Sequence, residues 1–392
     1  MTLKTRSYLD YNASAPLLEC ARDAIVDAYD RFGNASSVHF EGRAAKKTVE
    51  DARSTIADFL DANPANMIFT SGATEAANHI LSPKLRISGK QIRLDKLYVG
   101  ATEHPCITQG GRFLADNIKT LAVNELGLID LNALEQRLQA NHNADNPALV
   151  AVQLANSETG VIQPISRISD IVHAYDCFLL VDAVQGIGKI PFNIKELQAD
   201  FVIVSGHKIG GPQGIGALIL ANGNVSPEPL FKGGGQENYH RGGTENVAAI
   251  TGFAAACNWH KEYLTENIQN FSLRDSIEEG ISTISLETGN GVPQPVFFGK
   301  SASRLGNTSC FAVSGIKSET ALMSLDLDGV SVSSGSACSS GKVKQSHVLE
   351  AMGATPEEMA GALRVSIGWE TDLEDSRRFL TAWKTIVSRM AA

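Results

Sequence analysis

A lysine at the predicted end of a buried strand is the first candidate for chemistry in this chain. The apolar, β-branched run 201–204 has the length of a strand, and the glycine-rich stretch 209–216 after Lys208 excludes regular structure there. An ε-amine held partly out of water at such a strand end has a lowered pKa and can condense with a carbonyl as a Schiff base. A solvated loop lysine is the alternative.

An aspartate ends a second apolar run, because Asp182 directly follows residues 178–181. A carboxylate near that lysine is what a pyridoxal phosphate ring needs, since it keeps the ring nitrogen protonated and makes the ring an electron sink. An aspartate that caps the following helix is the alternative. Lys208 and Asp182 would place two complementary charges at neighbouring strand ends.

An anion site is predicted where residues 67–78 read as a strand, a turn of small residues and the start of a helix. Backbone N–H groups of residues 71–74, Ala73 among them, and the hydroxyl of Thr74 would meet at the helix N-terminus, where the helix dipole favours a phosphate. The alternative is an ordinary helix start with Glu75 in its first turn.

Two further polar residues lie on or after other predicted strands. His104 follows the strand-like run 96–100, and an imidazole there can stack on a flat ring and move protons near neutral pH. Arg364 lies in the run 362–368, where its guanidinium fork can grip a carboxylate in a bidentate pair. A lone loop histidine or a surface arginine usually does neither, so the residues alone leave both alternatives open.

Cys338 differs from the other cysteines because residues 333–342 around it are mostly serine and glycine. A thiol in such a loop is exposed, and it becomes reactive if a positive charge such as Lys342 lowers its pKa. An exposed but inert cysteine is the alternative. Because this loop has few apolar side chains, we expect residues 334–345 to be poorly ordered in the free protein, with Cys338 too far from the cofactor for direct attack without loop movement.

The elements that must position these residues alternate between helix and strand, which predicts an α/β protein with a mostly parallel sheet and a site along its C-terminal edge. With 392 residues, 43% of them hydrophobic, the chain can form a large domain over residues 15–258 and a smaller one over residues 1–14 and 259–392, which carries the cysteine loop. An amphipathic helix is predicted over residues 41–60, and an irregular glycine-rich loop over residues 231–246.

Composition excludes several other classes of protein. The net charge of −9 and the pI near 5.5 argue against nucleic-acid and anionic-membrane partners, which attract basic patches. The first ten residues contain no apolar signal segment and no apolar run is long enough to span a membrane, so a cytoplasmic location is expected. The 6 cysteines lack CxxC spacing, so neither a disulfide framework nor a metal site is expected.

Taken in order, these motifs resemble the cysteine desulfurases of the NifS/IscS type, which are class V aminotransferases among the pyridoxal-phosphate enzymes of fold type I. The resemblance covers nearly the whole chain and is carried by Tyr8-Leu9-Asp10, Gly33-Asn34, residues 36–39, 70–76, Glu103-His104, Glu158-Thr159-Gly160, residues 163–165, 182–185, 205–208, 233–237, 243–246 and 333–338. It implies a mostly parallel seven-stranded sheet in a large domain, beside a smaller α+β domain.

The resemblance also implies a role for individual residues. Lys208 would bind the aldehyde of pyridoxal 5'-phosphate as a Schiff base, Asp182 would pair with the ring nitrogen, and His104 would stack on the ring. Gln185 would bind the phenolic oxygen of the cofactor. Its phosphate would be bound by Ala73, Thr74, Ser205 and His207, and by Thr244 from the neighbouring subunit of a homodimer. Asn156 is also implied to bind the cofactor, and with Arg364 it would hold the substrate carboxylate.

The implied reaction takes sulfur from L-cysteine onto Cys338 as a persulfide and releases L-alanine, and the sulfur then passes to an acceptor such as an iron–sulfur scaffold protein or another thio-cofactor pathway. The alternative on the same fold is a selenocysteine lyase or another class V aminotransferase or lyase. Cys338 discriminates between them, because transamination needs no thiol. A non-catalytic partner in iron–sulfur assembly would have lost Lys208, Asp182 or Cys338, and all three are present.

Overall fold

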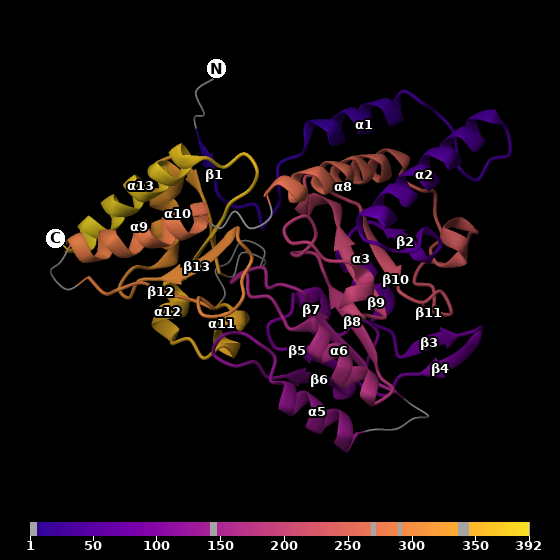
Figure 1. Cartoon of the computed structure of the whole chain (residues 1–392), viewed down its shortest axis with the longest axis horizontal. Coiled ribbons are helices and arrows are strands. Elements are labelled where there is room, and N and C mark those ends of the chain that lie inside the picture. Colours follow the sequence, from indigo (N-terminus) through magenta and orange to yellow (C-terminus); the bar gives the residue numbers. More distant parts are fainter. Residues whose placement is uncertain (1–5, 142–146, 268–271, 289–291, 336–344, 392) are drawn as a thin grey trace.

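The computed structural model describes residues 6–141, 147–267, 272–288, 292–335 and 345–391. Figure 1 shows two lobes: the larger one contains a long central sheet, and the smaller one combines the last third of the chain with the first described residues. In this described part of the chain, the structure contains no helix whose length and apolar character would let it cross a membrane.

The sheet of the larger lobe has seven strands in the order β2-β10-β9-β8-β7-β5-β6. Their bounds are β2 (Met67–Thr70), β5 (Leu97–Gly100), β6 (Ile118–Leu121), β7 (Leu149–Gln153), β8 (Phe178–Asp182), β9 (Phe201–Ser205) and β10 (Gly216–Leu220). Strands β6, β5, β7, β8 and β9 are parallel to one another, whereas β10 runs antiparallel to both of its neighbours. The predicted mostly parallel seven-stranded sheet is therefore confirmed.

Both faces of this sheet are covered, which explains why its strands read as unbroken apolar runs. Successive side chains of a strand point to opposite faces, and in β7 Leu149 and Ala151 belong to one apolar cluster while Val150 and Val152 belong to another. Every residue of β7, β9 and β10 is buried. The polar ends of these strands are consequently the places where the sheet can present chemical groups.

Helices surround the sheet of the larger lobe. They are α1 (Glu19–Tyr29), α2 (Phe40–Phe59), α3 (Ala73–Ile80), α4 (Pro105–Thr108), α5 (Leu131–Ala140), α6 (Ile165–Ala174), α7 (Ile194–Leu197) and α8 (Val247–Asn267). A three-stranded sheet, β11-β3-β4, lies at one end and comprises β3 (Lys84–Ile87), β4 (Lys90–Arg93) and β11 (Val225–Pro227). Figure 1 shows α1 and α2 packed beside α8.

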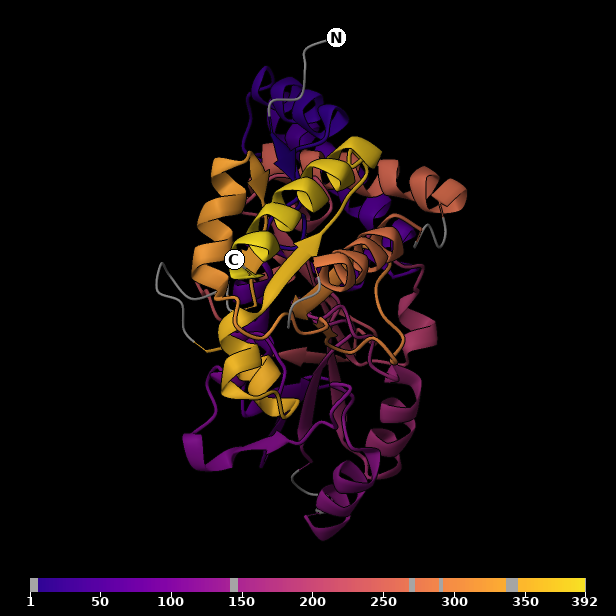
Figure 2. The same ribbon diagram turned by 90° about the vertical axis from the view of Figure 1, so that its left-hand side faces the viewer.

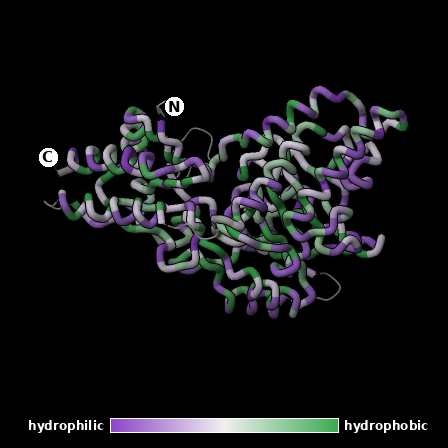
Figure 3. Tube along the Cα trace, turned by 45° about the horizontal axis from the view of Figure 1, so that its top comes forward, coloured by the Kyte–Doolittle hydropathy of each residue, from purple (hydrophilic) through white to green (hydrophobic). Residues whose placement is uncertain are grey.

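The amphipathic helix predicted over residues 41–60 is α2. His39 caps its N-terminus, because the imidazole accepts a hydrogen bond from the Gly42 N–H. Val49, Ala52 and Ile56 are buried on its inner face. In Figure 3, hydrophilic and hydrophobic residues alternate along the outer helices, as expected for helices with one buried face.

The smaller lobe has a four-stranded antiparallel sheet in the order β12-β13-β16-β15. Its elements are α9 (Ser272–Thr288), β12 (Val296–Phe297), β13 (Thr308–Ala312), α10 (Ser318–Leu327), β14 (Val330–Ser331), β15 (Ser333–Ser334), α11 (His347–Ala351), α12 (Pro356–Gly361), β16 (Leu363–Ser366) and α13 (Leu373–Ala391). Figure 2 looks onto this lobe and shows α9 and α13 in front of its sheet. Their apolar faces form one core with Phe311 and Val365 of the strands.

The N-terminal arm of the chain runs from the smaller lobe into the space between the lobes. Strand β1 (Ser7–Tyr8) pairs in parallel with β14, and Asp10 forms a further bridge to Ser366 of β16. The predicted domain boundary after residue 258 falls within α8, which packs on α1 and α2 of the larger lobe. The division into domains over residues 15–258 and over residues 1–14 with 259–392 stays a prediction.

Candidate active site

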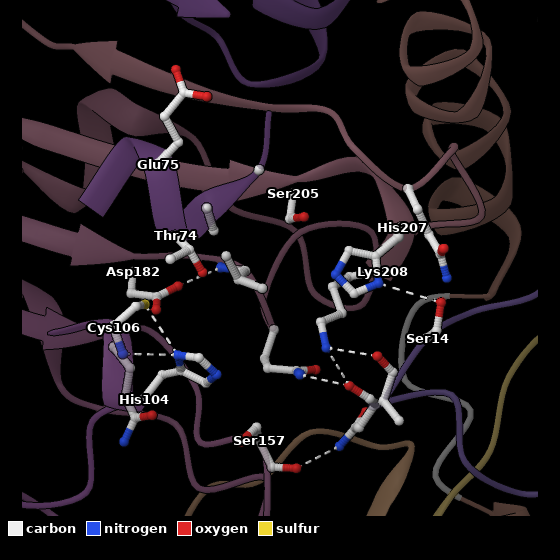
Figure 4. Close-up of a pocket in the computed structure, with 18 of the residues that line it drawn as sticks. Ser14, Thr74, Glu75, His104, Cys106, Ser157, Asp182, Ser205, His207 and Lys208 are labelled. Carbon is white, nitrogen blue, oxygen red and sulfur yellow. Dashed lines mark hydrogen bonds between the residues drawn. The ribbon is translucent and has the colours of Figure 1, made fainter. Parts of the chain in front are cut away.

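A cavity of about 470 Å³ opens at the C-terminal ends of the parallel strands, a volume typical of small-ligand sites. Nine residues that the sequence singles out line it: Ala73, Thr74, His104, Asp182, Gln185, Ser205, His207, Lys208 and Arg364. Figure 4 shows several of these side chains directed into one space from different elements. Strand ends, one helix start and the N-terminal arm therefore form a single site.

Lys208 reaches this cavity from a tight 3-10 turn that follows β9. The turn requires a glycine at its start, because a Cβ on Gly206 would lie 2.9 Å from the Ile215 side chain. The Lys208 Nζ donates hydrogen bonds to the backbone carbonyls of Asn12 at 2.6 Å and Ala13 at 3.0 Å. Both acceptors belong to the N-terminal arm, so neutral carbonyl groups hold the amine at the C-terminal edge of the sheet (Figure 4).

Asp182 is the last residue of β8 and is buried. Its Oδ1 accepts a hydrogen bond from the Val184 N–H at 3.0 Å. Burial raises the pKa of this carboxyl group to about 6, although Lys208 opposes the shift. A carboxylate that burial destabilises in this way gains strongly from a cationic partner, and a protonated ring nitrogen would supply one.

An uncapped helix start faces the same cavity. Gly72 precedes α3 with a φ of +151°, and among the described residues no side chain caps this N-terminus. Thr74 and the Ser205 hydroxyl line the cavity beside it. Backbone donors, a helix dipole and hydroxyl groups together suit a phosphate, as the sequence predicts.

Glu75 in the first turn of α3 does not oppose an anion at this position, because its charge is directed elsewhere. Its carboxylate binds Arg241 at 3.0 Å and accepts a hydrogen bond from the Ser71 N–H at 2.8 Å. Burial alone would raise the pKa of Glu75, but these bonds outweigh it and the pKa is lowered. Figure 4 shows Glu75 pointing away from Thr74 and Lys208.

Two histidines of the cavity are held neutral. Burial, with help from the positive charge of Lys208, lowers the pKa of His104 and of His207 to about 4. The His104 Nδ1 accepts a hydrogen bond from the Cys106 N–H at 3.2 Å, which places the ring proton of the neutral form on Nε2. His207 lies 3.3 Å from the Ser14 hydroxyl through Nδ1. Both rings can therefore approach an anionic ligand as neutral groups.

Arg364 lies on β16 and is fully buried below the cavity. One guanidinium nitrogen, Nη2, pairs with Asp10 Oδ1 at 2.7 Å, and the other, Nη1, donates to the Ser157 carbonyl at 3.1 Å. The smaller lobe thus supplies a cation to a cavity built mainly by the larger lobe. A guanidinium group is suited to bind a substrate carboxylate. To do so, Arg364 would either exchange its bond to Asp10 or add a bond beside it.

Asn156 is close to the cavity but does not line it. Its Nδ2 donates to the Thr102 carbonyl at 3.0 Å, while Oδ1 accepts from the N–H groups of Glu158 and Thr159 at 2.9 Å each. The side chain is therefore engaged in holding the turn after β7. A direct contact with cofactor or substrate would require it to exchange one of these bonds.

Thr244 lines a smaller neighbouring hollow of about 160 Å³, together with Ser71 and Gly214, which also border the main cavity. Within a single chain, Thr244 thus lies beside the phosphate end of the site and outside its lining. Cys338 lies outside the described residues. So do residues 336–344, which make up most of the loop 334–345 that the sequence predicts to be poorly ordered.

Two residues of the site carry no signal in the sequence. Asn12 of the N-terminal arm accepts from Gln185 Nε2 at 3.1 Å through its carbonyl, and its side chain accepts from Lys189 Nζ at 2.7 Å through Oδ1. Lys189 also donates to Gln185 Oε1. No periodicity or strand end marks either residue, because both acquire their positions from contacts that join distant segments of the chain.

Glu158 connects the turn after β7 to the segment that follows the cysteine loop. Its Oε2 accepts a hydrogen bond from the Ser346 hydroxyl at 2.6 Å, and Ser346 also caps α11. A Cβ on Gly335 would lie 3.2 Å from the same oxygen. Burial raises the pKa of Glu158 from 4.5 to about 7, with Ser346 and Arg364 opposing the shift. Both flanks of the cysteine loop therefore meet at one buried acid.

This shift predicts that the difference in stability between Glu158→Gln and wild type depends on pH. The folded protein binds a proton at Glu158 that the unfolded chain has lost, so stability falls as pH rises from about 4.5 to about 7. A neutral glutamine escapes this loss, and relative to wild type the variant should gain up to about 3 kcal/mol in free energy of unfolding between pH 5 and pH 8. Urea unfolding across this range measures the difference.

The exposed residue Glu135 on α5 provides a matched control. Glu135→Gln removes a carboxyl group from the surface and should change the free energy of unfolding only slightly. If the difference between Glu158→Gln and wild type is independent of pH, Glu158 ionises normally and the burial argument is wrong.

The mostly parallel sheet carries Lys208 just after β9 and Asp182 at the end of the neighbouring strand β8, and a helix start suited to a phosphate lies beside them. These features define the class of protein: a pyridoxal-phosphate enzyme of fold type I. The chain belongs to the class-V aminotransferase family, which matches residues 7–379. Enzymes of this family use pyridoxal 5'-phosphate. The buried carboxylate of Asp182, the uncapped helix start at Gly72 and the amine of Lys208 fit that cofactor.

Curated relatives are similar over almost their whole length. The cysteine desulfurase IscS of Dictyoglomus turgidum is 35% identical over 400 residues, which cover 99% of this chain and 96% of the relative. The cysteine desulfurase IscS 1 of Archaeoglobus fulgidus is 34% identical and covers 98% of this chain and 97% of its own length.

Solved structures show the same similarity. A NifS-like protein from Rickettsia africae superposes with a TM-score of 0.82 at 32% identity, covering 97% of this chain and 99% of that protein. Another NifS-like protein reaches a TM-score of 0.85 at 30% identity and covers 98% of this chain and all of its own. The predicted fold type and family are therefore confirmed.

Proposed function

We propose that this protein is a cysteine desulfurase, which takes the sulfur of L-cysteine onto one of its own cysteines and releases L-alanine. The observation that carries the proposal is the convergence of Lys208, Asp182 and Arg364 on one cavity in a chain whose full-length relatives are named cysteine desulfurases. Lys208 would supply the amine that binds the cofactor, Asp182 would pair with the ring nitrogen of the cofactor, and Arg364 would bind the carboxylate of the amino-acid substrate.

Pyridoxal 5'-phosphate, when bound, would draw electrons away from the substrate Cα. Asp182 would hold the ring nitrogen, Gln185 the phenolic oxygen, and His104 would stack on the ring. The phosphate would be bound by Ala73, Thr74, Ser205, His207 and, from the neighbouring subunit, Thr244. The raised pKa of Asp182, caused by burial, means that this carboxyl group would pair best with a cation, in agreement with its proposed role.

Lys208 would also move the proton of the substrate. Its neutral amine would take the proton from Cα, as a general base must lie beside the proton that it removes. Two carbonyl acceptors already hold its Nζ, so the amine remains positioned when it is released. Arg364, with Asn156 nearby, would fix the substrate carboxylate and thereby aim Cα at this base.

Cys338 would act as the nucleophile: its thiolate would attack the substrate sulfur, forming an S–S bond while the C–S bond breaks. The electron pair of the broken bond would stay with the substrate carbon, which takes up a proton and becomes the methyl group of L-alanine. Strand β15 ends shortly before it in the sequence, and Ser333 of that strand pairs in register with Arg364. The Ser333 hydroxyl donates to Asp10 Oδ2 at 2.7 Å. The start of the cysteine segment thus adjoins the proposed carboxylate site, which supports a thiol delivered to this cavity.

The sulfur would then pass to an acceptor protein, such as a scaffold for iron–sulfur clusters, by thiol exchange. A persulfide relay needs free thiols, and those are maintained in the reducing cytoplasm. All five cysteines in the described part of the chain are free. We propose that the reaction takes place in the cytoplasm, because that compartment keeps such thiols reduced.

A homodimer forms part of the proposal. Segment 31–40 contacts segment 231–246 where Gln236 Nε2 donates to the Ser36 hydroxyl at 3.2 Å. Large apolar side chains on these two segments are exposed: Phe32, Val38, Phe40, Phe231 and Tyr239. Exposed apolar side chains are typical of a protein interface, and two of them, Phe231 and Tyr239, belong to the same segment as Thr244.

Subunit mixing tests this arrangement. If Thr244 acts across the interface, inactive Lys208→Ala and Thr244→Val dimers should regain activity when their subunits exchange, because each mixed dimer has one intact site. Absence of recovery after verified exchange would contradict the shared site.

Product analysis tests the proposed reaction. Incubation of the protein with pyridoxal 5'-phosphate, L-cysteine and a thiol reductant should yield sulfide and L-alanine in equal amounts. Pyruvate or another keto acid without sulfide would show an aminotransferase instead. A rate with L-selenocysteine that far exceeds the rate with L-cysteine would favour the alternative, a selenocysteine lyase.

A further inference from the structure

Lys189 is a second lysine beside the proposed catalytic lysine, and no step of the proposed reaction uses it. It lies 4 residues after Gln185, beyond the end of β8, and is half-buried. Its Nζ donates to Asn12 Oδ1 at 2.7 Å and to Gln185 Oε1. The backbone carbonyl of the same Asn12 accepts from Gln185 at 3.1 Å and from Lys208 at 2.6 Å.

These bonds determine which way the Gln185 amide faces. The Lys189 Nζ donates to Oε1, and an ammonium group offers donors only, so it holds the amide with its oxygen towards Lys189. The Gln185 Nε2 then faces the Asn12 carbonyl and the cavity, which Gln185 lines. Without Lys189, only the Asn12 carbonyl would hold the amide in this orientation, and an exchange of its two ends would turn the oxygen towards the position proposed for the phenolic oxygen of the cofactor.

The electrostatic surroundings of Lys189 make this position costly to maintain. Burial lowers its pKa well below the usual lysine value, and the positive charges of Lys208 and Arg364 lower it further. Lys189 in turn lowers the pKa of His207 and of His260. A lysine among these cationic and neutral groups lowers the stability of the folded protein. Such a destabilising residue is a candidate for a role in the function of the site.

We propose that Lys189 is a positioning residue that fixes the amide of Gln185 so that its N–H group, and not its oxygen, is presented to the cofactor. The inference rests on the proposed binding of pyridoxal 5'-phosphate at Lys208 and extends it to a residue without a direct cofactor contact. A donor at the phenolic oxygen favours its ionised form and disfavours protonation of the bound cofactor. Lys189 thereby tunes the pH at which the bound cofactor gains a proton.

The experiment is a pH titration of the visible absorbance of the bound cofactor in a double-mutant cycle. Lys189→Met keeps the length of the side chain and removes its donors. We expect it to raise the protonation midpoint by about 1 pH unit, with Gln185→Ala giving a similar rise. In the double variant, we expect no further rise, because Lys189 acts through Gln185. Lys195→Met, which removes an exposed lysine bound to Asp61 at 2.8 Å, is the matched control and should leave the midpoint unchanged.

Two results would overturn the inference. An unchanged midpoint in Lys189→Met, with a lower free energy of unfolding for the cofactor-free protein, would show a purely structural lysine. Strictly additive shifts in the double variant would show a direct effect of its charge that does not pass through Gln185. If wild-type protein gives no titrating absorbance because no cofactor binds at Lys208, the proposed function itself fails, and this outcome is seen before any variant is compared.

Discussion

Replacing Lys208 with alanine is expected to remove the covalent bond between cofactor and protein and to lower the turnover of L-cysteine by about 10⁴-fold or more. The loss is large because one side chain supplies both the bond to the cofactor and the base that moves the substrate proton. Its Nζ is held by the carbonyls of Asn12 and Ala13, and alanine removes this amine.

Borohydride reduction followed by peptide mass spectrometry measures the first effect, because it fixes the cofactor to whichever lysine carries it. Wild-type protein should carry the adduct on Lys208, and the Lys208→Ala protein should carry none. The exposed variant Lys195→Met should retain both the adduct and full turnover. An adduct on Lys189, whose Nζ binds the same Asn12, would show that the wrong lysine has been assigned.

Replacing Cys338 with serine is expected to abolish sulfide formation, with a loss of about 10³-fold or more, while cofactor binding is retained. A hydroxyl group cannot accept a sulfur atom as a persulfide, but serine preserves the size and polarity of the loop residue. The absorbance of the bound cofactor should therefore equal that of wild type. After L-cysteine is added, only wild-type protein should gain the mass of one sulfur atom at this position.

Two other cysteines give the matched controls for this measurement. Cys20 is exposed on α1, and Cys20→Ser should retain the full rate of sulfide formation. Cys106 lines the cavity, yet burial raises its thiol pKa to about 12, so it is a poor nucleophile at neutral pH. A wild-type rate in Cys338→Ser would reject the thiol mechanism and favour a lyase that eliminates sulfur directly.

Strand ends were the most informative positions in the sequence. Apolar runs predicted β8 and β9, and the structure places Asp182 at the end of the first and Lys208 just after the second. These positions follow from local sequence, because a charge that interrupts an apolar run falls at the end of the strand. The direction of β10 does not follow in this way: its run 216–220 reads like its neighbours, yet it is antiparallel to them.

The polar network around Asn12 could not be predicted from the sequence for a different reason. Its side chain binds Thr308 at 2.8 Å and Lys189 at 2.7 Å, and both partners are far away along the chain. The pairing of Glu158 with Ser346 has the same origin. A local pattern indicates which residues leave the core but not which of them meet. The resemblance to a known family supplied residue roles at the site, and those roles stay predictions.

The position of Asn12 has a consequence for how the protein matures. Its backbone N–H binds the Ser366 hydroxyl at 3.0 Å, across a sequence separation of 354 residues, and β1 cannot pair before β14 exists. During synthesis, the sheet of the larger lobe can form while the later residues are still being made, because domains fold as their segments emerge. The bonds of Asn12 to Thr308 and Ser366 can form only after β13 and β16 have been synthesised. A nascent chain that ends before β16 therefore lacks part of the network that positions its cofactor lysine.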